Sequence, residues 1–64
     1  MTDRYALIAR KEEVRRKLEQ VRRTLERERA KVPPQQRLVN RLETQLEQLM
    51  AEEYNLRVAI DQAR

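Results

Sequence analysis

Arginine residues recur at seven-residue intervals in the first half of the chain. The residues with this spacing are Arg15, Arg16, Arg22, Arg23 and Arg29. On a helix they would project from one flank as a basic stripe, and guanidinium groups in a row can bind the phosphates of a nucleic-acid backbone. Glutamates are interleaved with these arginines, and the chain has only two tyrosines to stack on bases. A solvated helix face is therefore the alternative interpretation, and the one the composition favours.

Three pairs of carboxylates are the other residues that could carry chemistry, as ligands of Mg²⁺ or as an acid and a base. The pairs are Glu12/Glu13, Glu43/Glu47 and Glu52/Glu53. The chain has no histidine, cysteine, serine or glycine, which excludes Cys/His metal sites, Ser or Cys nucleophiles and glycine-rich phosphate loops. We interpret the pairs as solvating charge, and the composition predicts no metal, no cofactor and no catalytic residue.

Charged residues make up 41% of the 64-residue chain, whose formal net charge is +4. The bias toward Ala, Glu, Lys, Leu and Arg is typical of long helices and coiled coils. Residues 10–31 contain ten Lys/Arg and five Glu, whereas residues 35–64 contain four Arg and five Asp/Glu. No apolar run approaches the ~20 residues that cross a bilayer, and no signal-peptide pattern is present, so we predict a soluble, cytoplasmic protein with no membrane partner.

Apolar residues in each half recur with the period of about 3.5 residues that is typical of a coiled-coil seam. In the first half they are Leu7, Val14, Leu18, Val21, Leu25 and Val32. In the second half they are Val39, Leu42, Leu46, Leu49, Leu56 and Ile60. Each half is therefore predicted to form one long helix, the first capped by Thr2 or Asp3.

The two halves meet at Pro33 and Pro34, which predict a corner between the helices. Proline disfavours helical geometry in the residue before it and has no N–H to donate, whereas Pro34 suits the first turn of a following helix. We predict one all-α domain over residues 1–64, an antiparallel two-helix coiled-coil hairpin with helices at about 3–32 and 34–63. A proline kink in one continuous helix is the alternative.

Antiparallel packing requires facing core positions to have a nearly constant sum of residue numbers, and a sum of 67 gives the most apolar layers. This register pairs Leu25 with Leu42, Val21 with Leu46, Leu18 with Leu49, and Leu7 with Ile60. On the flanks of the seam it brings oppositely charged residues together, namely Arg22 near Glu43 and Lys17 near Glu52.

Two core positions in this register are charged, because Lys11 faces Leu56 and Glu53 faces Val14. Lys11 and Glu53 occupy adjacent layers, where a diagonal ion pair would disfavour slipped registers. The alternative is that both side chains extend to water.

A second apolar surface is expected outside the seam, near the end of the hairpin remote from the prolines. Its residues are Tyr5, Ile8, Ala9, Met50, Tyr54 and Val58, with Leu38 near the corner as an extension. A chain of this length is near the lower limit for a stable monomeric core. We therefore predict self-association, most simply a homodimer packed as a four-helix bundle, or docking of a protein partner on this surface.

The segment from Leu42 to Tyr54 reads Leu-Glu-Thr-Gln-Leu-Glu-Gln-Leu-Met-Ala-Glu-Glu-Tyr. It resembles the signature of the small sporulation-regulatory aspartyl-phosphate phosphatases, which reads Leu-Ser-Gln-x-Leu-Asp-x-Leu-Ile-x-x-Tyr-Tyr. The proteins of this family are helical hairpins of similar size. The matching residues are Leu42, Leu46, Leu49 and Tyr54, with Met50 for Ile and Glu47 for Asp, while Glu43, Thr44 and Glu53 depart from the signature. The resemblance implies hydrolysis of the aspartyl phosphate of a response regulator, with Glu47 as the acidic site residue.

Three functions follow from these patterns. The leading hypothesis is a non-enzymatic helical-hairpin module for protein–protein interaction or regulation, which self-associates and binds a protein partner still to be identified. The second is the phosphatase activity that the resemblance implies. The third is nucleic-acid backbone binding through the basic first helix.

Overall fold

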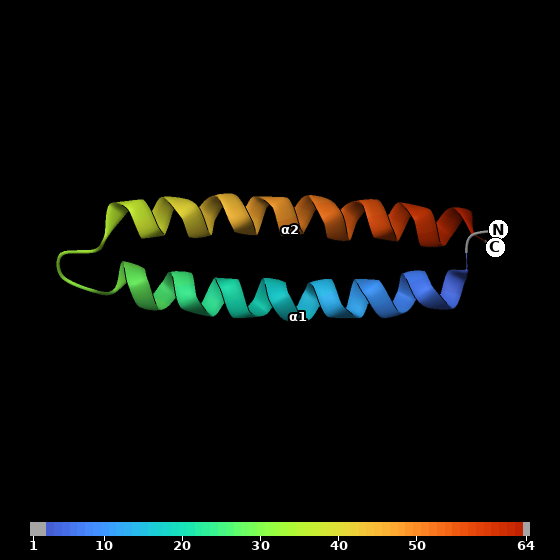
Figure 1. The fold of residues 1–64 in the computed structure, drawn as a ribbon, viewed down its shortest axis with the longest axis horizontal. Helices are drawn as coiled ribbons and strands as arrows, with labels where there is room; N and C mark the ends of the chain where they lie inside the picture. Colours follow the sequence, from blue (N-terminus) through green and yellow to red (C-terminus); the bar gives the residue numbers. More distant parts are fainter. Residues whose placement is uncertain (1–2, 64) are drawn as a thin grey trace.

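The computed structural model describes residues 3–63, which form two helices packed side by side (Figure 1). Helix α1 spans Arg4–Arg29 and helix α2 spans Gln36–Gln62. The chain reverses direction between them, so the first turn of α1 lies at the same end as the last turn of α2. The molecule is a rod of 49 × 14 × 13 Å, and residues 3–63 contain no strand. The predicted all-helical hairpin is confirmed.

Helix α1 begins at a side-chain cap. Asp3 has extended backbone geometry, and its carboxylate accepts a hydrogen bond of 3.0 Å from the Tyr5 backbone N–H. This bond satisfies one of the N–H groups that a helix start leaves without a partner. Arg27 and Arg29 occupy the last turn, where their charge opposes the partial negative charge of the helix end. Asp3 is thus one of the two predicted caps, and Thr2 lies outside the described residues.

The corner between the helices is longer than the sequence predicts. Helix α1 ends at Arg29 and not near residue 32, and α2 begins at Gln36 and not at Pro34. Because each proline disfavours helical geometry in the residue before it, neither Val32 nor Pro33 can continue α1. Val32 consequently leaves the interface, with 96% of its surface exposed, and its predicted place in the seam is wrong.

The rest of the predicted seam forms the core. The buried hydrophobic residues are Val14, Leu18, Val21, Leu25, Val39, Leu42 and Leu56. The best-packed part lies in the half of the rod near the corner, where Val21, Leu25, Val39 and Leu42 form one cluster. Leu38, Leu46 and Leu49 are partly buried against this cluster. Leu7 and Ile60, at the open end of the rod, are also only partly buried.

Two ion pairs join the flanks of the helices. Arg29 Nη2 lies 3.0 Å from Glu43 Oε1, and Arg10 Nη2 lies 3.3 Å from Glu52 Oε1. The predicted cations for these carboxylates are Arg22 and Lys17, each seven residues away from the cation that is observed. Residues one heptad apart share a flank of the helix, so the sequence identified the flank and the carboxylate but not the partner.

Of the two charged core positions, Glu53 is paired within its own helix. Glu53 Oε1 accepts a hydrogen bond of 3.0 Å from Arg57 Nη2, one helical turn further along α2. Among the described residues, no ion pair within 4.0 Å joins Glu53 to Lys11, so the predicted diagonal pair is not formed in this structure. Lys11 is only partly exposed at its core position.

Glu28 is a buried charged residue outside the predicted seam. It follows Leu25 by three residues and therefore continues the core spacing, and 9% of its surface is exposed. Lys31 Nζ donates to Glu28 Oε1 at 2.9 Å, while Glu28 Oε2 is buried without a hydrogen-bond partner. The alternation of four- and three-residue steps could have identified this position, because Glu28 and not Val32 ends the seam of α1.

Candidate interaction surfaces

Large hydrophobic side chains are exposed on both helices, outside the seam. Those predicted to form the second apolar surface are all exposed, namely Tyr5, Ile8, Ala9, Met50, Tyr54 and Val58. Tyr5 is 84% exposed and Tyr54 64% exposed, which are high values for side chains of this size. Leu38, the predicted extension, instead packs against the core cluster.

The exposed apolar residues extend further along the rod than the open end. Tyr5, Ile8 and Ala9 lie in the first two turns of α1, and Val58 lies near the end of α2. Met50 lies near the middle of α2, and Tyr54 one turn beyond it. The predicted residues are therefore exposed, but they span more of the molecule than its open end.

One groove combines apolar and cationic side chains, and we call it the Met50 groove. It is shallow, and it is lined by Leu18, Arg22, Met50, Glu53, Tyr54 and Arg57. Leu18 is a buried seam residue, whereas Met50 and Tyr54 are more than half exposed. The groove thus exposes two large apolar side chains of α2 over the seam, with an arginine from each helix beside them.

The arginines of the predicted basic stripe do not share one surface. Arg22 lines the Met50 groove together with α2 residues that follow Leu49. Arg23 lines a different groove, against Leu42 and Gln45 of α2. Arg29 is occupied by its ion pair with Glu43. The stripe is therefore divided between two sides of the hairpin, which seven-residue spacing on one helix cannot reveal, because the side is defined by the neighbouring helix.

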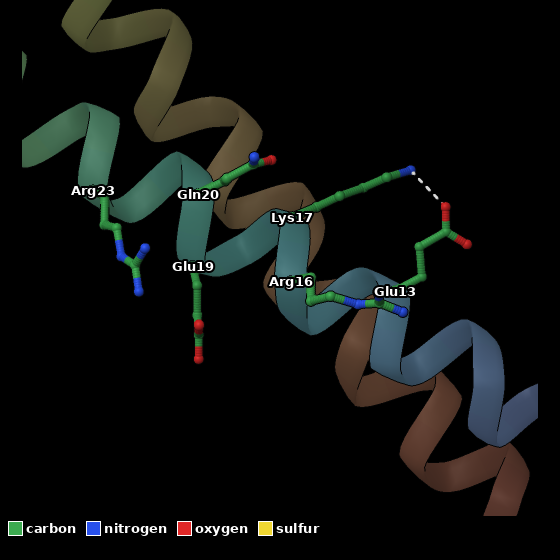
Figure 2. A pocket seen from close by; sticks show the side chains of 6 residues that line it. All are labelled: Glu13, Arg16, Lys17, Glu19, Gln20 and Arg23. Carbon is green, nitrogen blue, oxygen red and sulfur yellow. Dashed lines mark ion pairs between the residues drawn. The ribbon is translucent and has the colours of Figure 1, made fainter.

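The outer surface of α1 is a mixture of both charges (Figure 2). Lys17 and Glu13 form an ion pair of 3.6 Å, one helical turn apart. Glu19 and Arg23 project in the same direction, so a carboxylate accompanies this arginine on its outer side. The remaining lining residues are Arg16 and Gln20. This surface lies on one helix and contains no cavity between elements.

A second groove between the helices has a different composition, and we call it the Arg27 groove. It is lined by Gln20, Val21, Arg23, Thr24, Arg27, Leu42 and Gln45. Two arginines and two glutamine amides are present, and no carboxylate lines it. Val21 and Leu42 belong to the buried core cluster, so the side chains available to a ligand are polar or cationic.

Among residues 3–63, no group of three or more Asp or Glu side chains is arranged to bind a metal ion. Glu52 and Glu53 each accept from an arginine, and Glu43 does the same. Glu47, the residue singled out by the phosphatase resemblance, is exposed on α2. The phosphatase activity stays a prediction that rests on the sequence pattern.

Neither helix contains, over the described residues, an apolar stretch that could cross a membrane. No protein-family model matches the chain, and no match was found among curated proteins or among solved structures.

Proposed function

We propose that this chain is a non-enzymatic interaction module that associates with a second copy of itself through the Met50 groove and the exposed apolar residues that lie between this groove and the open end of the rod. The observation that carries the proposal is the exposure of Met50 and Tyr54, which line one groove together with the buried seam residue Leu18. Scattered apolar residues are normal on a protein surface, but neighbouring ones of this size mark interaction sites.

The thin core supports the same conclusion. Seven hydrophobic residues of the described chain are buried, and none of the described side chains is less than 2% exposed. The seam of a lone helical hairpin is open to water on both flanks, whereas a second hairpin packed on it as a four-helix bundle covers one of these flanks. Covering Leu18, Met50 and Tyr54 with another hairpin would add apolar burial worth about 25 cal/mol for each Å² removed from water.

A second copy suits the size of this surface. A stable interface takes about 800 Å² from each partner, which is about one seventh of the 5512 Å² that this molecule exposes. One long face of a 49 × 14 Å rod supplies an area of this order. Two-fold symmetry brings the same surface into the contact twice, so both apolar surfaces are covered in one association.

Sedimentation velocity over a range of micromolar concentrations tests the proposal. We expect the wild type to sediment as a dimer, and the double variant Met50→Glu/Tyr54→Glu as a monomer, because each new carboxylate would have to be desolvated in the interface. The matched control is Gln45→Glu/Gln48→Glu, which adds the same charge to exposed positions of α2 away from Met50.

The control variant is expected to remain dimeric. Circular dichroism of each variant verifies that the helices are formed before association is compared. A wild type that is folded and monomeric at every concentration contradicts the proposal. Equal weakening by the two double variants also contradicts it, because the effect would then come from net charge and not from the Met50 groove.

A further inference from the structure

We propose that the Arg27 groove binds the phosphate backbone of a double-stranded nucleic acid. The side chains that would make the contacts are Arg23, Arg27 and Gln20 of α1 and Gln45 of α2. This surface is distinct from the Met50 groove, and only Arg23 is shared with the stripe predicted from the sequence.

The charge of the Arg27 groove is available to a ligand. Neither Arg23 nor Arg27 forms an ion pair within 4.0 Å among the residues that the structure describes. The cations that do form such pairs are Arg10, Lys17, Arg29, Lys31 and Arg57. Because no carboxylate lines the groove, an anion that enters it meets uncompensated positive charge on the groove side of Arg23 and Arg27.

The neutral polar residues suit phosphate oxygens as well. The amides of Gln20 and Gln45 make no hydrogen bond to another described residue, so their N–H groups are free to donate. Thr24 is different, because its hydroxyl donates to the Gln20 backbone carbonyl at 2.9 Å. Amides and guanidinium groups together are the side chains that position proteins on nucleic-acid backbones.

The floor of the groove favours a phosphate backbone over a peptide or a membrane. Val21 and Leu42 are each only 8% exposed, so no apolar pocket is open for the anchoring side chain that a peptide interface requires. None of the exposed large hydrophobic residues lines this groove, whereas binding to a lipid surface depends on apolar side chains that insert into it.

The absence of aromatic residues in the groove favours a duplex over a single strand. Single-strand binders stack bases on aromatic rings. Tyr54 lines the Met50 groove, and Tyr5 lies in the first turn of α1, so the described tyrosines are both elsewhere. A surface that contacts only phosphates reads no base sequence.

One further arginine lies next to the groove, on the outer surface of α1 that also carries Glu13 and Glu19. Arg16 lies on the outer surface that shares Gln20 and Arg23 with the Arg27 groove. From Arg16 to Arg27 the helix rises by roughly 16 Å. One strand of a duplex presents a phosphate about every 3.4 Å along its axis, so this length faces about five phosphates.

Fluorescence anisotropy with a labelled DNA duplex of mixed sequence, longer than the 49 Å molecule, tests the inference over a series of salt concentrations. We expect the wild type to bind at low salt and the variant Arg23→Gln/Arg27→Gln to bind roughly tenfold more weakly or worse. The slope of log K against log salt is expected to fall by about 1.8, because two phosphate contacts are lost.

The matched control is Arg15→Gln/Arg22→Gln, which removes the same charge from α1, with Arg22 on the Met50 groove. The affinity of this control variant for the duplex is expected to differ from that of the wild type by less than about threefold. A second variant, Gln45→Glu, places a carboxylate in the groove without altering α1, and it is expected to weaken binding as well. Circular dichroism confirms that each variant is folded.

Three results would overturn the inference. The first is a wild type that does not retain the duplex at low salt. The second is an equal loss of affinity in the two arginine variants, or full binding by Gln45→Glu. The third is tighter binding to single-stranded DNA or to vesicles of anionic lipid than to the duplex.

Discussion

Glu28 places a carboxylate in the last layer of the helix interface before the corner. One of its oxygens accepts from Lys31, and the other is buried without a partner. A buried polar atom left in this way costs about 1–3 kcal/mol, because it has lost its hydrogen bonds to water. The interface therefore contains one position at which the native residue opposes stability.

Replacing Glu28 with leucine is expected to stabilise the hairpin. The substitution removes the buried charge, leaves Lys31 exposed to water, and fills the layer with an apolar side chain. We expect the free energy of unfolding to rise by about 1–2 kcal/mol. For a domain of this size, each kcal/mol raises Tm by about 4–8 °C. Thermal unfolding followed by circular dichroism at one fixed protein concentration measures the change.

The control for Glu28→Leu is Glu26→Leu, at an exposed position of the same helix. This change is expected to alter the free energy of unfolding by less than about 0.5 kcal/mol. A lower Tm for Glu28→Leu would show that the carboxylate stabilises the corner through Lys31 by more than its burial costs.

The sequence predicted which side chains are buried better than it predicted which charged side chains pair. Val14, Leu18, Val21 and Leu25 were predicted as core from spacing alone, and they are buried. Spacing specifies a position on the helix but not the rotamer of a long charged side chain, so the partners of Glu43 and Glu52 were predicted wrongly. Ion pairs on exposed flanks differ by well under about 1 kcal/mol, which is too little for the sequence to specify one.

The half of each helix near the corner carries most of the packing. Val21 and Leu25 of α1 pack there against Val39 and Leu42 of α2. Only a short corner separates these residues in sequence, so the chain loses little entropy when they come together. This half is expected to be the more stable part of both helices.

Leu25→Ala tests the importance of that cluster. Leu25 is 3% exposed, and truncating a leucine in such a position costs about 2–5 kcal/mol. For a hairpin of this size we expect loss of most of the helical signal in circular dichroism, or unfolding at much lower urea. Val32→Ala is the control, because Val32 is exposed and its truncation is expected to cost less than about 0.5 kcal/mol. A comparable loss in both variants would place Val32 in a contact that this structure does not contain.

The helices as elements could be predicted from the sequence, and their ends could not. Proline chemistry locates a corner at Pro33 and Pro34, and heptad spacing assigns each side of it to a helix. No comparable sequence rule predicts the backbone path between Arg29 and Gln36. Their path depends on how α2 must turn to pack its Val39 and Leu42 against α1, which is a property of the whole interface.

At the scale of the whole molecule, the hairpin has two sides with different chemistry. The Met50 groove exposes apolar side chains, and the Arg27 groove exposes arginines and amides. The sequence predicted the apolar residues but assigned the arginines to one stripe, because residues adjacent in sequence, such as Arg22 and Arg23, are divided by the position of α2. Gln45→Glu is therefore expected to weaken nucleic-acid binding and to leave self-association intact. Met50→Glu is expected to weaken self-association and to leave nucleic-acid binding intact.

Because the first turn of α1 and the last turn of α2 lie at the same end of the rod, a force applied there would separate the helices starting from that end (Figure 1). A tension applied between the first turn of α1 and the last turn of α2 loads the layers one after another, as in a zipper, and not all at once. Leu7 and Ile60 would separate first, and the cluster around Leu25 and Leu42 would open last. In an optical trap we expect gradual opening at low force that closes again from the corner when the tension is released, and not a single abrupt rupture.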